Sequence, residues 1–238
     1  MQTVDLNKID LKPGDRVLDA GCGSGRHLSE AFRRQGVDVV GIDMNVDDLT
    51  QARNTLRIME KEGESGQGNW GTYAADITNL PFADRSFDLV ICSEVLEHIP
   101  EDRRAIREII RVLKDGHLMA VSVPRYFPES VCWALSRDYR NEPGGHIRIY
   151  RKQHLTNLLE SQGLHCLSEG RAHALHSPYW WLKCFVGHKN DEHWLVRLYH
   201  QFLVWDIIKR PWLTQFLDYF LNPVISKSTV LYLKKEGY

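Results

Sequence analysis

The sequence predicts an α/β fold: a doubly wound, mostly parallel sheet of seven strands with a helical insertion before the last strand. Apolar runs of strand length alternate with segments of helical spacing, as successive βαβ units require. The 238 residues, 43% of them hydrophobic and 26% charged, suffice for one large globular core. We expect a core over 1–170, an aromatic-rich helical insertion over 171–226, and a final core strand within 227–238.

The predicted elements follow one another in the order of a parallel α/β domain. The strands are expected at 16–20, 37–43, 70–75, 87–92, 117–123, 163–168 and 228–233. The core helices are expected at 26–34, 46–62, 101–113 and 151–161. Prolines and the pair Gly144-Gly145 predict irregular structure over 125–150.

Composition and charge narrow the possible classes of function. The net charge of −1 argues against a nucleic-acid-coating polycation. Five widely spaced cysteines without a C-x-x-C pair argue against a disulfide framework and a structural zinc site. Neither a secretion signal nor an uncharged stretch of spanning length is present, so we expect a cytoplasmic protein, with attachment to a membrane periphery as an alternative.

The loop Gly21–Gly25, between the first strand and its helix, is the strongest functional signal. Glycines let a ligand lie against bare backbone at a helix N-terminus. A dinucleotide fingerprint needs a third glycine where Arg26 stands, which disfavours a nicotinamide oxidoreductase. Asp19, just before the loop, would repel a diphosphate and suits a ligand with a cationic amino group, such as S-adenosylmethionine (SAM).

Four motifs resemble those of class I SAM-dependent methyltransferases, in particular the ubiquinone-type and sterol-type enzymes that act on small molecules and lipids. The motifs are Val17–Gly25, Gly41–Asp43, Asp76-Ile77 before Leu80-Pro-Phe82, and Phe87–His98. The resemblance covers residues 16–170. It implies a Rossmann-like class I fold, SAM as the cofactor, and methyl transfer to a small-molecule or lipid-like acceptor.

The resemblance also implies a set of cofactor-binding residues. They are Asp19, Gly21, Gly23, Gly25, Asp43, Met44, Asp76, Ile77 and Ser93. Asp43 would accept both ribose hydroxyls, Met44 and Ile77 would flank the adenine, and Asp76 would accept its amino group. The alternative for Asp43 and Asp76 is a solvated acid or a helix cap at the end of a strand.

Two groups of residues are candidates for catalysis. His98 follows the carboxyl end of a strand and could take a hydroxyl proton, or it could simply hold its loop. His146, Arg148 and Tyr150 alternate and would share one face of an extended segment, and the resemblance implies that this segment lies beside the acceptor. The histidine could then be the base and the arginine could bind an anionic group, or all three could anchor the preceding loop.

The absence of certain motifs limits the classes of acceptor and of cofactor that we expect. The segment Cys92–Glu97 stands where amine methyltransferases commonly carry an Asn/Asp-Pro-Pro-Tyr/Phe loop, which disfavours adenine and glutamine acceptors. Glu94, Glu97 and His98 lack the paired histidine spacing of a zinc helix, so we predict no metal. We expect transfer to a hydroxyl, less favourably to a carbon, of a hydrophobic molecule, and no nucleic-acid partner. RNA or protein methylation, and SAM binding without catalysis, stay as alternatives.

The insertion departs from the pattern of the resembling family, because about sixty residues separate Ser168 from Ser228. It holds five of the seven tryptophans, and residues 171–238 carry a net charge of +4 against −5 for 1–170. Segments 177–185, 192–210 and 212–221 predict two or three helices. They could form a plain cap, a lid over the acceptor, a dimer contact, or a peripheral membrane contact through 177–221. The oligomeric state stays open.

Overall fold

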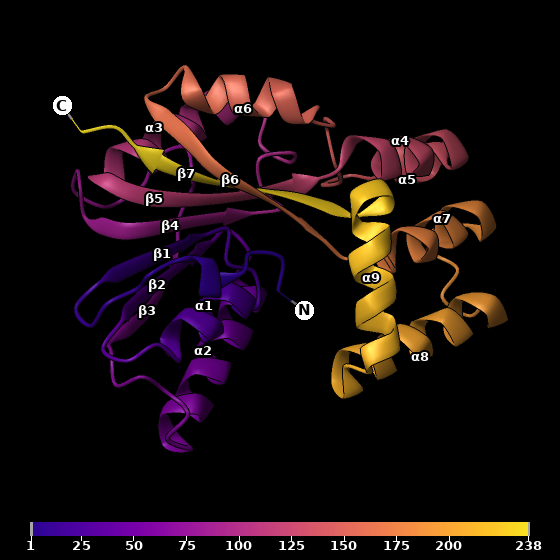
Figure 1. Ribbon diagram of the computed structural model, residues 1–238, viewed down its shortest axis with the longest axis horizontal. Helices are drawn as coiled ribbons and strands as arrows, with labels where there is room; N and C mark the ends of the chain where they lie inside the picture. Colours follow the sequence, from indigo (N-terminus) through magenta and orange to yellow (C-terminus); the bar gives the residue numbers. More distant parts are fainter. Residues whose placement is uncertain (1, 238) are drawn as a thin grey trace.

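The computed structural model describes residues 2–237, and a seven-stranded sheet runs through its centre (Figure 1). The strands are β1 (Arg16–Ala20), β2 (Asp38–Asp43), β3 (Trp70–Ala74), β4 (Phe87–Ser93), β5 (Leu113–Pro124), β6 (Leu164–Ala172) and β7 (Ser228–Lys235). Their spatial order is β3-β2-β1-β4-β5-β7-β6, and β7 runs antiparallel to both of its neighbours. The predicted fold class is confirmed.

Helices cover both faces of the sheet. They are α1 (Arg26–Phe32), α2 (Val46–Lys61), α3 (Asp102–Val112), α4 (Tyr126–Leu135), α5 (Arg137–Arg140), α6 (Lys152–Glu160), α7 (His176–Val186), α8 (Trp194–Lys209) and α9 (Trp212–Ile225). Apolar side chains of α1 and α2 form one core with one face of the sheet, and those of α3 and α6 form a second core with the other face. Burial of these two apolar faces is the main force that holds the layers together.

Two stretches differ from the predicted elements. β5 begins at Leu113, directly after α3, because the buried Leu113 pairs in the sheet with Phe87, the first residue of β4. The strand is therefore longer than the predicted 117–123 and includes Asp115 and Gly116. The stretch 125–150, predicted as irregular, contains α4 and α5. Pro128 is the third residue of α4, where the missing N–H leaves no helical hydrogen bond unmade.

The N-terminal segment is tied to the edge of the core. The short 3₁₀ helix η1 (Leu6–Lys8) lies within it. The backbone N–H groups of Thr3 and Val4 both donate to Nε2 of His27 on α1, at 3.2 and 3.1 Å. Burial lowers the pKa of His27 to about 4, so its ring is neutral and can accept these bonds.

The insertion between β6 and β7 forms three helices, α7 to α9, which lie together at one end of the molecule, on the right in Figure 1. Tyr199 of α8 donates a hydrogen bond to the carbonyl of Leu175, at the start of α7. Asn222 of α9 accepts one from the backbone N–H of Ala174. None of the helices in residues 2–237 has the length and apolar character to cross a membrane.

Candidate active site

The glycine loop brings the backbone of β1 to an open crevice at the carboxyl end of the sheet. β1 lies between β2 and β4, where the strand order reverses and open α/β sheets hold their ligands. Gly21 has φ +79°, and a Cβ added there would lie 2.4 Å from a methyl group of Val95. Gly25 caps α1 in the left-handed conformation with φ +85°. The loop therefore needs glycine both for its backbone angles and for its close packing.

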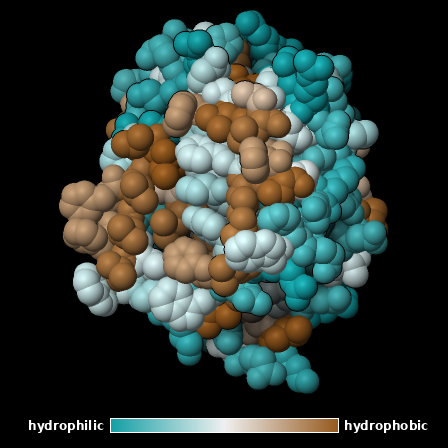
Figure 2. All heavy atoms as spheres, turned by 90° about the vertical axis from the view of Figure 1, so that its right-hand side faces the viewer, coloured by the Kyte–Doolittle hydropathy of each residue, from teal (hydrophilic) through white to brown (hydrophobic). Residues whose placement is uncertain are grey.

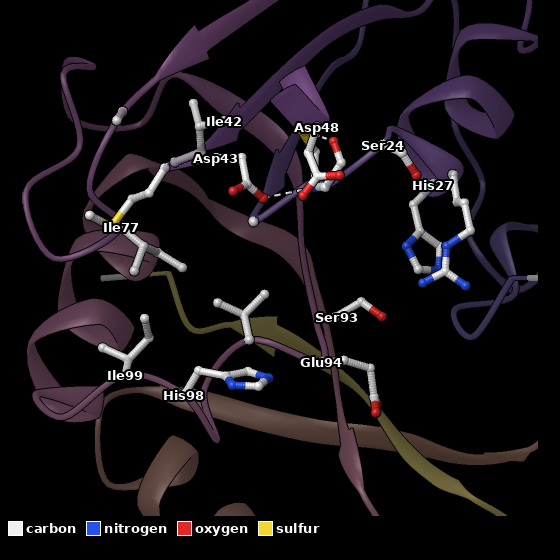
Figure 3. Close-up of a pocket in the computed structure, with 17 residues that line it drawn as sticks. Ser24, His27, Ile42, Asp43, Asp48, Ile77, Ser93, Glu94, His98 and Ile99 are labelled. Atoms are coloured by element: carbon white, nitrogen blue, oxygen red, sulfur yellow. Dashed lines mark hydrogen bonds between the residues drawn. The ribbon is translucent and has the colours of Figure 1, made fainter. Parts of the chain in front are cut away.

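A first cavity of about 440 Å³ opens beside this loop, a size typical of small-molecule sites. Figure 3 shows Asp43 and Asp48 on one side of it and Glu94 and His98 on the other. Asp43 ends β2, and its two carboxylate oxygens accept hydrogen bonds from the backbone N–H groups of Gly23 and Asn45, both at 2.8 Å. Each oxygen keeps a second lone pair for a ligand. The carboxylate is thus fixed in place and still able to accept.

The structure brings together most of the cofactor-binding residues that the sequence predicts. Those that line the first cavity are Gly21, Gly23, Asp43, Met44, Ile77 and Ser93. Met44 is 71% exposed although apolar, so it offers a free surface to a flat ring. Asp76 is not among the lining residues, because its carboxylate accepts the backbone N–H of Thr78 and caps the turn after β3.

The position of Asp19 differs from the prediction. We expected its negative carboxylate to favour a cationic ligand in the crevice. Its side chain is buried beneath the loop, 1% exposed, and does not line the cavity. One oxygen accepts the backbone N–H of Leu28, and the other has no partner in the described residues. Burial raises the pKa of Asp19 to about 7. Asp19 therefore supports the start of α1, and the carboxyl groups that line the cavity are those of Asp43, Asp48 and Glu94.

A second cavity of about 570 Å³ adjoins the first. The two share Arg26, Glu94 and His98 among their lining residues. Tyr139 and Trp180 give the second cavity aromatic walls, and Lys183, His188 and Lys227 add polar ones. Because the cavities meet, ligands bound in each would lie next to one another.

A buried charge network lies behind the second cavity. Glu129 of α4, 1% exposed, accepts hydrogen bonds from Nδ1 of His146 at 2.6 Å and from Nζ of Lys227 at 2.7 Å. Burial raises the pKa of Glu129, but the bond from His146 and the charge of Lys227 outweigh it and lower that pKa to about 2. Burial lowers the pKa of Lys227, and the charge of Glu129 more than reverses that change. Glu129 and Lys227 are therefore both ionised at neutral pH.

The two candidate histidines lie side by side, with ring centroids 4.9 Å apart. Nδ1 of His98 lies 3.0 Å and 3.1 Å from the carbonyl oxygens of Gly144 and Gly145. Since a carbonyl only accepts, this nitrogen carries the proton and Nε2 is the atom that can take another. The Glu129 carboxylate fixes the same tautomer on His146. Burial and then the neighbouring His146 lower the pKa of His98, so its ring is neutral near pH 7.

Two further carboxyl groups lie in the loop after β4. Glu94, with φ +57°, accepts a hydrogen bond from the Ser122 hydroxyl, and burial raises its pKa. Glu97 is 1% exposed, and neither of its oxygens has a hydrogen-bond partner in residues 2–237. Burial and the charge of Glu94 raise the pKa of Glu97 well above its usual range. Glu97, His98 and His146 each place a potential metal-ligating atom within 4.8 Å of the other two, and the predicted absence of a metal stays a prediction.

Arg148 and Tyr150 lie outside both cavities. Arg148 donates to the carbonyls of Leu96, Ile99 and Pro100 and forms an ion pair with Asp102 at 3.1 Å. The Tyr150 hydroxyl donates to the same Asp102 carboxylate. These bonds hold the loop between β4 and α3, so the geometry favours anchoring over contact with an acceptor. Of the segment 146–150, His146 is the one residue that lines either of these two cavities.

Several residues that line the two cavities or support the second one were missed by reasoning from the sequence. Glu129 lies in the stretch predicted as irregular, and Lys227 lies about a hundred residues further along the chain, so no spacing pattern links them. Asp48 and Arg26 also line the first cavity. Arg26 lies in the first turn of the helix after β1, and Asp48 lies in the first turn of the helix after β2. This position could have identified both residues, because ligands bind where these strands end.

Comparisons with known proteins agree with this geometry. The family model described as a methyltransferase domain matches residues 4–169. The chain is 32% identical over 166 residues to a ubiquinone biosynthesis O-methyltransferase of Coxiella burnetii, covering 67% of each chain. It is 31% identical over 150 residues to cycloartenol-C-24-methyltransferase 1 of Oryza sativa subsp. japonica, covering 63% of this chain and only 40% of that enzyme. A Bacillus halodurans structure described as a methyltransferase has a TM-score of 0.64 at 18% identity over 98% of this chain and 97% of that one, so the two share the fold.

Proposed function

The chain belongs to the methyltransferase domain family, and from that premise we propose that it transfers a methyl group from SAM to a hydroxyl of a small hydrophobic molecule. The observation that carries the proposal is the meeting of two cavities at Glu94 and His98. One has the glycine loop and an acceptor carboxylate, and the other has aromatic walls and three histidines. A donor and an acceptor could therefore be held in contact.

The first cavity suits SAM in its chemistry. Gly23 leaves open space where a side chain would stand, so the methionine part can lie on its backbone. Asp43 would accept the ribose hydroxyls, and Met44 and Ile77 would contact the two sides of the adenine ring. Ser93 would meet the methionine end. Asp19 and Gly25 would act from beneath the loop by holding its shape. When bound, SAM supplies a methyl carbon attached to a positively charged sulfur.

The reaction asks the protein mainly for alignment, exclusion of water and removal of one proton. The acceptor oxygen forms a bond to the methyl carbon while the carbon–sulfur bond breaks, and S-adenosylhomocysteine remains. His98 lines both cavities, and its Nε2, which lies 3.9 Å from the buried Glu97 carboxyl, would take the hydroxyl proton. His146, held by Glu129, is the second candidate for this role.

The acceptor is proposed from the second cavity and from the relatives. Tyr139 and Trp180 suit an aromatic or alicyclic body, and the histidines suit a hydroxyl. The Coxiella relative is described as an O-methyltransferase and the rice relative as a C-24-methyltransferase, so a carbon acceptor is the alternative. We further propose the division into a core of 1–170 and 227–238 and an insertion of 171–226, although β6 extends to Ala172.

Calorimetric titration with SAM and with NAD tests the cofactor. We expect SAM binding in the wild type and its loss in Asp43→Ala, while circular dichroism shows an unchanged fold. Binding of NAD alone would refute the proposal.

Incubation with methyl-labelled SAM and fractionated metabolite and lipid extracts tests the reaction. The product fraction gives the acceptor, and alkaline stability of the label distinguishes an ether from an ester. In His98→Ala we expect turnover to fall roughly 10²–10⁴-fold with unchanged SAM affinity. Full activity in that variant, with loss of activity in His146→Ala, would assign the base to His146.

A further inference from the structure

The outer surface of α8 and α9 is unusual for a helical layer on a globular core. Figure 2 shows hydrophobic residues gathered over this end of the molecule. Of the 23 large hydrophobic side chains that are exposed in the described chain, 14 lie in α7 to α9. They are Phe185, Trp194, Leu198, Val204, Trp205, Ile207, Ile208, Trp212, Leu213, Phe216, Leu217, Tyr219, Phe220 and Val224. A cluster of this size marks a contact surface rather than ordinary surface composition.

The amphipathic pattern of α9 is inverted. Its inward side carries the polar residues Thr214, Asp218 and Asn222, at the i, i+4 and i+8 spacing of one helix face. Asp218 accepts the backbone N–H of Leu175, and Asn222 accepts that of Ala174. The outward side is almost wholly apolar, with Gln215 as its polar member. A surface helix in water has the opposite arrangement, so the outer side of α9 is suited to an apolar environment.

The charged residues at the turn between α8 and α9 indicate what kind of apolar environment the outer side of α9 contacts. Lys209 and Arg210 are exposed there, between Ile208, which is 70% exposed, and Trp212, which is 76% exposed. The two acidic residues of these helices, Asp206 and Asp218, are half-buried. They therefore do not balance the positive charges of Lys209 and Arg210 at the surface. Tryptophan beside basic residues on an apolar helix suits the boundary between lipid headgroups and acyl chains.

We propose that the α8–α9 face (the exposed apolar residues of 194–225 with Lys209 and Arg210) docks on a lipid bilayer that contains anionic headgroups. The apolar side chains enter the boundary layer, and the two basic residues contact headgroup phosphates. α7, which packs against α8, supplies Trp180 and Lys183 to the second cavity. Docking therefore brings that cavity close to the bilayer. Docking of this kind requires surface residues alone and does not depend on methyl transfer.

Flotation of the full chain with vesicles tests the proposal. We expect it to float with vesicles of phosphatidylglycerol and phosphatidylcholine and to bind less as salt is raised. Ile208→Glu with Trp212→Glu should weaken binding at least about a hundredfold, because two apolar contacts are replaced by charges. Lys209→Glu with Arg210→Glu should weaken it roughly thirtyfold or more. Ile58→Glu on α2, also exposed, is the matched control and should bind like the wild type.

Three outcomes would overturn the proposal. The wild type could fail to float with the anionic vesicles. It could float while Ile208→Glu with Trp212→Glu floats equally well. Sedimentation could instead show a dimer that the same double variant dissociates, which would assign the α8–α9 face to a second copy of the chain. Because the altered residues are exposed, circular dichroism and SAM affinity should be unchanged in every variant.

Discussion

Replacement of Glu129 by alanine should strongly destabilise the protein. The pKa of Glu129 falls from an ordinary 4.5 to about 2 in the folded state, which corresponds to about 3 kcal/mol of stability at neutral pH. The variant also leaves the Lys227 cation, half of a buried pair, without its partner, and such losses cost about 3–5 kcal/mol. We expect the free energy of unfolding in urea at pH 7 to fall by about 3–5 kcal/mol.

Two controls make this prediction specific to the buried pair. Glu129→Leu combined with Lys227→Met should recover at least about half of the loss, since no buried charge is then left unpaired. Glu62→Ala, at an exposed carboxylate after α2, should change the free energy by less than about 0.5 kcal/mol. In the wild type, the contribution of Glu129 should be lost as the pH falls from about 4.5 toward 2, because its folded pKa is the lower one. A loss of less than about 1 kcal/mol in Glu129→Ala would show that the pair is not the stabilising unit inferred here.

Three other predictions concern the loop and two histidines. Gly21→Ala should cost roughly 1–3 kcal/mol in thermal unfolding, because the new Cβ meets Val95 and the backbone angle is left-handed, and a variant as stable as the wild type would contradict the close packing. If His98 is the base, kcat should be constant above pH 6.5 and fall only below it, because the pKa of His98 is lowered. The same decrease of kcat at low pH in His98→Ala would exclude that role. His27, with a folded pKa of about 4 against 6.5, should lose up to about 3 kcal/mol of stability as the pH falls from 6.5 to 4, and His27→Gln should show a shallower slope in urea unfolding.

Sequence patterns correctly predicted the elements whose structure is determined by residues close together in the sequence. The apolar runs that form β1, β2 and β4 are buried on both faces, which is why continuous hydrophobicity identified them. The glycine loop and Asp43 were found for the same reason, because strand, turn and helix follow one another directly. Six of the nine expected cofactor residues line the first cavity, and Asp19 and Asp76 are turned to backbone partners instead.

Features that depend on distant residues could not be predicted from spacing. His146 was a candidate, but its partner Glu129 comes from a helix expected as loop, and Lys227 comes from beyond the insertion. The alternation of His146, Arg148 and Tyr150 predicted one shared face. The carbonyls of 96–100 and the Asp102 carboxylate instead bind the latter two side chains, because a partly buried guanidinium needs several acceptors.

The position of β7 has a consequence for the order in which the molecule assembles during synthesis on the ribosome. β7 lies between β5 and β6, so β6 has no hydrogen-bonded neighbour in the sheet until a strand made some sixty residues later is available. Lys227 immediately precedes that strand. The ion pair between Lys227 and Glu129, and the part of the second cavity's wall that Lys227 forms, are therefore also completed only after β7 is synthesised. The nascent chain can complete the crevice beside Asp43 early, whereas the neighbouring chamber forms only when β7 is inserted.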